Sequence, residues 1–334
     1  MRTYIGREWA AVIFIAALTG TARAQDTPAE RLIAAGHWKR ARALVESRYR
    51  DAPNDPLANF LMSQIRAAFG DRTPPMPFAE KAVTLDGRTA KYHRQVAEVA
   101  GIMAQHAGLF QQVLLARRFR REIDAARALD SRDVQAWRDQ MEFDLLAPGV
   151  VGGDQRQAVA VAARIGAIDP AEGFMAQARI AEFHKQPAET GKFLRRAVEA
   201  DPASYRARIA LARFYASADR FHPEDAIREA QLAIQLDHGR VDAYSVLAEV
   251  FARLADFVRL DTVLEKAGVE VPDDLTPYYR AAEVLFASQR GEARAQLYLR
   301  TYLSQEPEGN EPLSADANRL LRDVLRQQTS AKGS

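Results

Sequence analysis

The sequence contains no cysteine. A chain without cysteine forms no disulfide bonds and offers no thiolate for metal binding or nucleophilic catalysis. It also lacks the cysteine that would carry the lipid anchor of a bacterial lipoprotein. These absences exclude thiol-based enzymes, thiolate metal sites and lipid-anchored lipoproteins from the classes open to this protein.

Long apolar runs are also scarce, and the one that stands out lies at the N-terminus. Residues 10–18 are continuously apolar, follow a basic segment at residues 1–8, and precede Ala-Arg-Ala at residues 22–24. This order is typical of a signal peptide, and nine apolar residues are too few to span a bilayer, which needs about 20. An uncleaved anchor is the alternative. We expect cleavage after Ala24, a mature chain that begins at Gln25, and a periplasmic or secreted location.

An excess of charge of one sign is missing as well. The formal net charge is +2, and residues 1–24 account for all of it, since the remainder holds 43 basic and 43 acidic residues. A near-neutral mature chain gives no support to nucleic-acid binding through bulk charge. No second segment is apolar enough for a membrane span. We therefore expect no nucleic-acid partner and no membrane span in the mature chain.

Strand patterns and catalytic motifs are not found. No run shows the sustained polar-apolar alternation of a strand. The histidines are scattered, and Glu182-Phe183-His184 lacks a second histidine at metal-ligand spacing. No glycine-flanked serine marks a nucleophile elbow. We expect no enzyme, no metal and no cofactor, although a catalytic site assembled from distant segments stays open as a further hypothesis.

What the sequence does contain is a recurring phrase: an alanine-rich amphipathic stretch that ends in a small or aliphatic residue, an aspartate and a turn residue. It occurs at Asp86-Gly87, Asp130-Ser131, Asp169-Pro170, Asp201-Pro202 and Asp237-His238, and Pro272 and Pro307 close two further stretches. Successive closing residues are 32 to 44 positions apart. A period of this length is typical of helix-turn-helix repeats.

Apolar spacing and punctuation divide the chain into helix pairs. Eight pairs are predicted, at about 27–52, 56–86, 88–130, 132–169, 171–201, 203–237, 240–270 and 274–305. A helix near 312–327 is expected to cap the last apolar face. The predicted organisation is a signal peptide at 1–24, a helical repeat domain at 25–327 and a disordered tail at 328–334. A proline cluster leaves the repeat register within 70–130 open.

The first pair carries Gly36, Trp38, Ala41 and Pro53 at spacings that resemble the tetratricopeptide repeat (TPR) family. A later unit keeps near-family offsets at Tyr244, Leu247, Ala248, Phe251, Phe257, Leu264, Ala267 and Pro272. Small residues at such positions let two helices approach, and large ones fill the gap to the next pair. The resemblance implies an all-α fold, an α-solenoid of about eight antiparallel pairs wound as a right-handed superhelix.

In this family the first helix of each pair lines a concave groove, with outward positions at fixed offsets. Carried over to this chain, those positions are Arg138, Glu142, Gln177, Arg206, Arg213, Asp242, Glu249, Tyr279 and Glu283. Mixed charges suit an extended peptide or protein segment. The resemblance implies a non-catalytic scaffold of the cell envelope whose partner is another protein or a peptide. Solvated faces with no binding role are the equal alternative.

The loop Ala147–Asp154, APGVVGGD, is the nearest approach to an anion-binding motif. A phosphate loop needs lysine and then serine or threonine after its last glycine, and here Asp154 and Gln155 follow. An aspartate at a helix start is a cap, so a structural role is favoured. The loop is similar to one in exported repeat proteins that accompany tripartite solute transporters. That resemblance implies the alternative function, an accessory of periplasmic solute transport with a small-ligand cavity at Gly149–Asp154.

A basic run is the last candidate binding feature. It comprises Arg117, Arg118, Arg120 and Arg121, with Arg127 after them. Such a run suits a phosphate or an acidic partner. Because Glu122 and Asp124 are interleaved with it, a solvated helix face with i,i+4 ion pairs is favoured.

Overall fold

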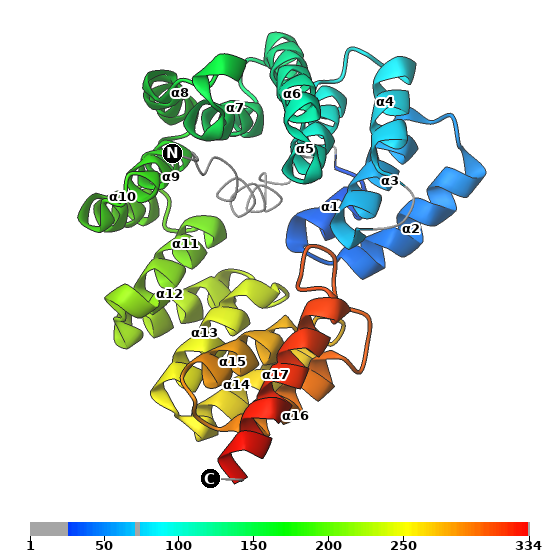
Figure 1. Ribbon diagram of the computed structural model, residues 1–334. Helices are drawn as coiled ribbons and strands as arrows, with labels where there is room; N and C mark the ends of the chain where they lie inside the picture. The colour runs from blue at the N-terminus through cyan, green and yellow to red at the C-terminus, as the bar shows by residue number, and fades with distance from the viewer. Residues whose placement is uncertain (1–25, 71–73, 333–334) are drawn as a thin grey trace, which may run out of the picture. The chain divides into compact units, whose positions relative to one another are not determined.

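We describe the protein from a computed structural model, which places residues 26–70 and 74–332 (Figure 1). The predicted signal peptide and its cleavage site after Ala24 lie outside these residues. Across the described ranges the regular elements are helices and no strand occurs. The all-α prediction is therefore confirmed.

The chain forms two compact units. Unit 1 takes in Arg40–Asp201 with the residues up to Ala34, and unit 2 takes in Pro202–Ser334 with the short segment Ala35–Lys39. The helices built mainly from unit 1 are α1 (Pro28–Ala35), α2 (Trp38–Asp51), α3 (Pro56–Phe69), α4 (Met76–Leu85), α5 (Ala90–His106), α6 (Leu109–Leu129), α7 (Val134–Leu146), the short 3₁₀ turn η3 (Gly149–Val151), α8 (Gln155–Ile168), α9 (Pro170–Phe183) and α10 (Pro187–Ala200).

Unit 2 continues the same pattern. Its helices are α11 (Tyr205–Ala216), the 3₁₀ turn η4 (Ala218–Arg220), α12 (Pro223–Leu236), α13 (Val241–Leu254), α14 (Phe257–Glu270), α15 (Thr276–Ala287), α16 (Glu292–Tyr302) and α17 (Ser314–Lys332). The predicted pairs match these helices to within a few residues at their ends. The final helix differs, because it extends past residue 327, and the tail expected from 328 onward is helical as far as Lys332.

The recurring aspartates explain why the helices end where they do. Asp86, Asp130 and Asp237 stand at the C-caps of α4, α6 and α12 in extended backbone conformation. Each side chain accepts a hydrogen bond from the N–H two residues later, at 3.0, 2.9 and 3.0 Å respectively. This side-chain turn competes with continued helix and reverses the chain. At these three turns an aspartate in the same position ends the helix.

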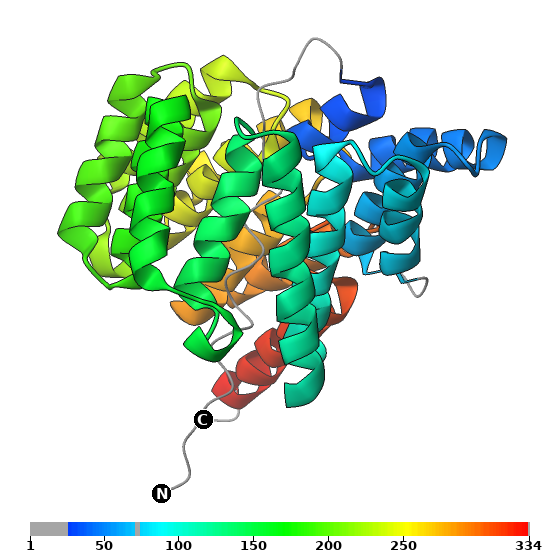
Figure 2. The same ribbon diagram turned by 90° about the horizontal axis from the view of Figure 1, so that it is seen from above.

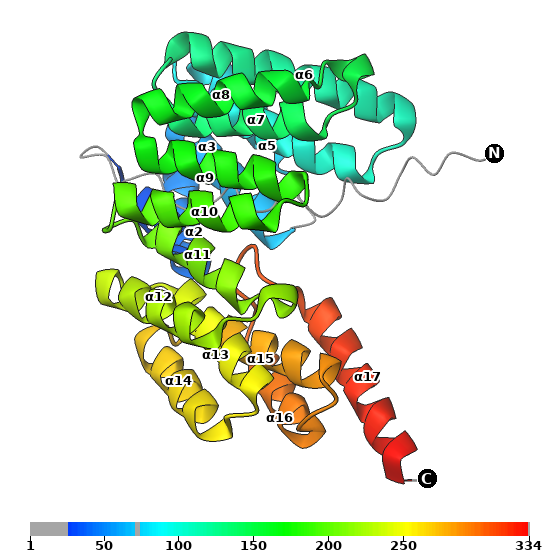
Figure 3. The same cartoon turned by 90° about the vertical axis from the view of Figure 1, so that its left-hand side faces the viewer.

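Within each unit, a buried hydrophobic cluster extends from one helix pair into the next. One buried cluster joins α7, α8 and α9, and its members are Met141, Leu145, Ala158, Val161, Ala162, Ile165 and Ala176. A second joins α11, α12 and α13 through Tyr205, Ile209, Ala233 and Ala243. Figure 3 shows α7 to α10 of unit 1 lying one after another, and Figure 2 shows the same green helices from above. No single pair contains the whole of either cluster.

The α1–α2 turn forms as its sequence predicts. Gly36 has a φ of 91°, in the left-handed region that glycine adopts without a steric cost. Trp38 starts α2 and is 5 % exposed, and Ala41 and Val45 are fully buried on the same helix. Among the described helices none is both long and apolar enough to cross a bilayer.

Candidate functional site

First helices of neighbouring pairs pack on one another. In unit 1, α3 contacts α5 and α7 contacts α9; in unit 2, α11 contacts α13 and α13 contacts α15. In each unit, consecutive first helices therefore lie side by side, and the residues on their outward positions share one face.

In unit 1 this face carries a set of charged residues that we name the unit-1 row. Its members are Arg94 and Glu98 on α5, Arg138, Asp139 and Glu142 on α7, and Glu172 and Arg179 on α9. Their ion pairs join successive first helices. Arg138 and Glu142 are the two members that the family offsets predicted. Those offsets were applied only from α7 onward, so they gave no position on α5. On α9 they selected Gln177, which is not a member of the row.

Two ion pairs link α7 to its neighbours on either side. Arg94 Nε donates to Asp139 Oδ2 at 3.0 Å, which ties α5 to α7. Arg179 donates to both oxygens of Glu142, at 2.8 and 3.1 Å, which ties α7 to α9. A forked contact of this kind fixes the orientation of both side chains. The predicted Glu142 thus lies in a preorganised pair.

Arg138 and Gln177 complete the predicted positions in unit 1. Arg138 donates to Gln135 at 2.8 Å and lies 3.9 Å from Glu172 on α9. Gln177 is half-buried on α9, two residues before Arg179. The structure therefore brings Arg138 and Glu142 to one face, together with partners that the sequence did not identify, whereas Gln177 is turned about 200° around α9 from Arg179.

Two glutamates of the unit-1 row, Glu98 and Glu142, have raised pKa values. Burial, reinforced by the nearby Asp139 carboxylate and opposed by Arg94, raises the pKa of Glu98 to about 7. Burial also raises the pKa of Glu142, although Arg179 opposes the change. Near neutral pH the Glu98 carboxyl exchanges between a form that donates a hydrogen bond and one that only accepts.

In unit 2 the corresponding face carries the unit-2 row. Its members are Arg213 on α11, Asp242 and Glu249 on α13, and Arg280 and Glu283 on α15. Arg213 donates to Asp242 at 2.6 Å, and Arg280 donates to Glu283 at 3.0 Å. Burial raises the pKa of Glu249, while Arg280 and Arg213 oppose the shift. Four of the five members were predicted, and Arg280 was missed.

Two predicted positions of unit 2 differ in character from the rest. Tyr279 is only 7 % exposed, and its ring lies 5.2 Å from the ring of Tyr302, so it packs rather than lines a surface. The next residue, Arg280, carries the exposed charge instead. Arg206 is half-buried on α11. Tyr279 and the predicted Glu283 are four residues apart on one side of α15, so the packing of Tyr279 on Tyr302, and not the register, removes Tyr279 from the surface.

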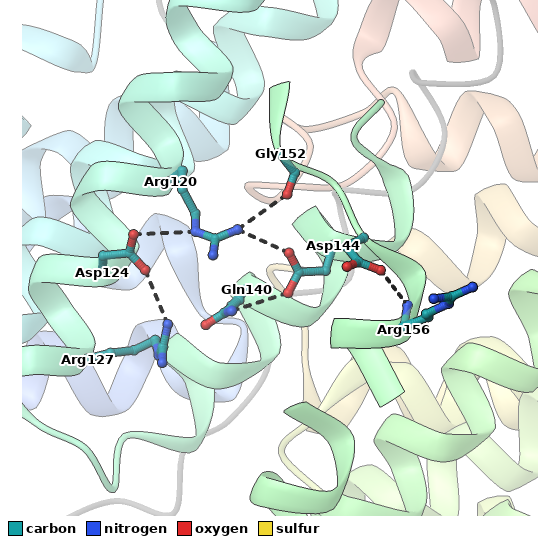
Figure 4. A network of polar contacts seen from close by, with 8 residues as sticks. Arg120, Asp124, Arg127, Gln140, Asp144, Gly152 and Arg156 are labelled. Atoms are coloured by element: carbon teal, nitrogen blue, oxygen red, sulfur yellow. Dashed lines mark hydrogen bonds and ion pairs between the residues drawn. The ribbon is translucent and has the colours of Figure 1, made fainter. Parts of the chain in front are cut away.

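The Gly149–Asp154 loop is held by a polar network within unit 1 (Figure 4). Asp144 is 1 % exposed and accepts hydrogen bonds from Arg120 at 3.2 Å and Gln140 at 3.2 Å. The same Arg120 also reaches the carbonyl of Gly152 at 3.4 Å. Asp154 caps α8 by accepting from the N–H of Arg156 at 2.9 Å.

The loop's geometry supports the predicted structural role. The Asp154 carboxylate already accepts an N–H at the start of α8, where an anion would bind, and it adds negative charge. A Cβ at Gly153 would stand 1.8 Å from the Ala147 carbonyl oxygen, so only glycine fits. A transport accessory would need a small-ligand cavity beside this loop. The Arg120–Asp144 ion pair lies at that place.

The basic run on α6 is ion-paired. Arg118 lies 2.6 Å from Glu80 on α4, and Arg120 and Arg127 lie 3.3 and 3.2 Å from Asp124. Arg127 also stacks 3.8 Å from the centre of the Trp137 ring. This arrangement agrees with a solvated helix face that joins α6 to neighbouring pairs.

No protein-family model matches this chain, and no curated protein matches it. Among solved structures it is similar to yeast Tom70, with a TM-score of 0.57 and 14 % identity over 93 % of this chain and 67 % of that one. It is similar to human IFIT1, solved as a dimer with m7Gppp-AAAA, with a TM-score of 0.50 and 12 % identity over 91 % and 73 %. A thermophilic TPR protein of Thermus thermophilus gives a TM-score of 0.48 and 16 % identity over 56 % and 94 %.

Identities this low establish the fold alone. The protein has a TPR-like α-solenoid fold, as the positions of Gly36, Trp38 and Ala41 indicated.

Proposed function

We propose that the protein is a non-catalytic scaffold that binds another protein or a peptide along its charged rows. The observation that carries this proposal is the pairing of charges between consecutive first helices, as in Arg179–Glu142 of unit 1 and Arg213–Asp242 of unit 2. An extended peptide presents N–H and C=O groups in alternation, and a surface with both signs of charge meets both.

The rows are suited to binding because their side chains are already ordered. Arg94 and Arg179 are each fixed by a carboxylate on the neighbouring first helix. A partner that docks on them incurs little entropic cost from ordering the scaffold. Glu98, with a pKa raised to about 7 by burial, adds a group that donates to a carbonyl or accepts from an N–H near neutral pH.

We infer a non-catalytic role because the two most buried carboxyl groups with raised pKa values in unit 2 are out of reach of a substrate. In unit 2, burial raises the pKa of Asp274 and of Glu308, and each of these residues is only 4 % exposed. A general acid or base has to come within hydrogen-bond reach of its substrate. Buried as they are, these carboxyls fit a structural or regulatory part better than a catalytic one.

The net charge of the chain beyond residue 24 indicates which class of partner it binds. The balance of basic and acidic residues beyond residue 24 favours a protein or peptide over nucleic acid. We further propose export, with residues 1–24 removed. Sequencing the N-terminus of exported protein should give Gln25 first, and a chain that still begins at Met1 would refute the proposed cleavage.

A peptide-display selection with the full chain as bait tests the binding role. Selected peptides are titrated by fluorescence anisotropy against the double variants Arg138→Ala/Glu142→Ala and Arg213→Ala/Glu249→Ala. We expect at least one of these to weaken binding about tenfold or more, because each removes two charges from a row.

Matched controls remove the same charges from second helices. They are Arg195→Ala/Glu199→Ala on α10 and Glu265→Ala/Lys266→Ala on α14, where all four side chains are exposed. These variants should bind within about twofold of the parent chain. Equal affinities for row and control variants, with helical circular dichroism unchanged, would place the binding surface elsewhere.

A further inference from the structure

Residues 303–313, which join α16 to α17, form an irregular loop that packs within unit 2 (the 303–313 loop). At its end the Tyr302 hydroxyl donates to the Pro312 carbonyl at 2.5 Å. Near its start Gln305 donates to the Pro272 carbonyl at 3.3 Å. The loop is therefore tied at both ends to the rest of the unit.

The middle of the loop inserts a glutamate into the interior of the unit. Glu308 is 4 % exposed, and its Oε1 accepts the backbone N–H groups of Lys39 and Gly309. Its Oε2 is buried without a hydrogen-bond partner. A buried carboxylate oxygen without a partner strongly disfavours ionisation. Burial raises the pKa of Glu308 to about 7, with Lys39 opposing.

The second buried acid of the loop faces the unit-2 row. Glu311 Oε2 lies 3.8 Å from Arg280 on α15. Burial and the neighbouring Asp274 carboxyl raise the pKa of Glu311, and Asp242 adds to the shift while Arg280 and Arg213 oppose it. The loop thus contacts the unit-2 row at Arg280, whose side chain stays 36 % exposed beside it.

Every element around the two glutamates contributes a charged or titratable group. These groups are Lys39 in the first turn of α2, Arg213 on α11, Asp242 on α13, Asp274 before α15, Tyr279 and Arg280 on α15, and Tyr302 on α16. Arg213 and Arg280 already pair with Asp242 and Glu283. If Asp274, Glu308 and Glu311 all ionise, their three negative charges therefore meet few positively charged side chains that are not already in ion pairs.

We propose that the 303–313 loop is a proton-controlled latch, which contacts the unit-2 row at Arg280 while Glu308 and Glu311 are protonated and leaves it when they ionise. The role of the exposed surface in binding rests on the proposed function. The movement of the loop is inferred separately, from the burial of Glu308 and Glu311. Its release would separate Glu311 from Arg280 and open to a partner the side of Arg280 that the docked loop contacts.

The direction of the pH effect follows from proton linkage. Below pH 4.5, the ordinary value for a glutamate, docked and released loops are both protonated, so docking is fully favoured. Above it the released loop loses protons while the docked loop retains them. Docking therefore weakens as the pH rises, and the loss is complete only above the raised pKa values of Glu308 and Glu311.

Hydrogen–deuterium exchange of the full chain measures the latch directly. Each linked proton changes the docking equilibrium about tenfold per pH unit within this window. After correction for intrinsic rates, protection of amides in residues 303–313 should fall at least about tenfold between pH 6 and pH 8. Amides of α14 provide the internal reference, which should not change.

Two variants separate the latch from general pH effects. Glu308→Gln/Glu311→Gln removes the ionisable groups and keeps an oxygen acceptor for Lys39, so the loop should stay protected at both pH values. Glu265→Gln, an exposed position on α14, should keep the wild-type pH dependence. Circular dichroism at each pH confirms that the helices persist.

Three results would overturn the proposal: wild-type protection that does not change with pH, a double variant that retains the wild-type slope, or a double variant whose loop is unprotected at pH 6. The measured signal comes from the loop and needs no partner. A latch that opens as expected on a protein that binds no peptide would therefore refute the scaffold proposal alone.

Discussion

Replacement of Gly173 by alanine tests how the helix pairs of unit 1 stack. Gly173 lies in the first turn of α9, where that helix crosses α8. A Cβ added there would stand 2.3 Å from Gly166 Cα and 2.7 Å from Gly166 N. Both are backbone atoms of α8, so no side-chain rotation relieves the clash and the helices have to separate by about 1 Å.

The size of the effect follows from two opposed contributions. Forcing extra volume into a packed interface costs about 1–3 kcal/mol, and a clash with backbone belongs at the upper end. Alanine in place of glycine within a helix returns about 1 kcal/mol. Gly173→Ala should therefore lower the free energy of unfolding by about 2 kcal/mol.

Gly166 on the opposing helix provides the matched control. A Cβ at Gly166 would lie 3.5 Å from Gly173 Cα, which is ordinary van der Waals contact. Gly166→Ala should gain up to about 1 kcal/mol from helix propensity. The melting temperatures of the two variants should then differ by roughly 6–12 °C, at about 2–4 °C per kcal/mol.

Thermal unfolding followed by circular dichroism at 222 nm, with urea titration as a second measure, gives both values. If Gly173→Ala melts at or above Gly166→Ala, α8 and α9 do not approach as closely as described. The stacking that places Glu172 and Arg179 beside α7 would then be wrong as well.

Three further substitutions probe other parts of the molecule. Asp144→Ala should cost about 2–4 kcal/mol in urea denaturation, because it leaves the Arg120 guanidinium and the Gln140 amide without their buried acceptor; a cost under about 0.5 kcal/mol would contradict this. Glu98→Gln should raise the melting temperature at pH 8 but not at pH 4.5, because the wild-type carboxyl loses stability as the pH rises from 4.5 through about 7; equal effects at both pH values would be evidence against its raised pKa. Ala248→Trp, at a fully buried position on α13, should lower stability by about 3 kcal/mol, and an unchanged melting temperature would show that the repeat register there is wrong.

The helices were predictable because their signals are local. An aspartate two residues before an N–H that it can bind, as at Asp86 and Asp130, ends a helix without help from distant segments. Gly36 likewise sets a left-handed turn by its own conformational freedom. Such signals need only the residues next to them, so the boundaries of the pairs followed closely from the sequence.

The charged rows were only partly predictable because they depend on register and on partners. Family offsets identified Arg138 and Glu142, but Arg94 entered the unit-1 row through a contact with Asp139, 45 residues away. On α15 the offsets that selected Glu283 also selected Tyr279, which is buried against Tyr302, while the charge of the adjacent Arg280 was missed. No local pattern shows which of two adjacent helix residues faces a neighbour when the repeat diverges.

The 303–313 loop lay beyond sequence reasoning for a different reason. The acidic residues of this loop predict an exposed, polar connection between two helices. The sequence alone gives no sign that Glu308 is buried. Burial arises because the N–H of Lys39, 269 positions earlier, meets the Glu308 carboxyl. A buried acid in an irregular segment indicates a constraint other than stability, since an apolar residue would avoid the desolvation penalty.

Both rows and the latch use the same physical device. In Glu98, Glu249 and Glu311, burial raises the pKa of the carboxyl while a neighbouring arginine opposes the rise. A surface balanced in this way responds to the approach of another charged group by taking up or releasing a proton. Binding to such rows should therefore be linked to pH even where no loop moves, and the linkage should be strongest on unit 2, where the latch and the row share Arg280.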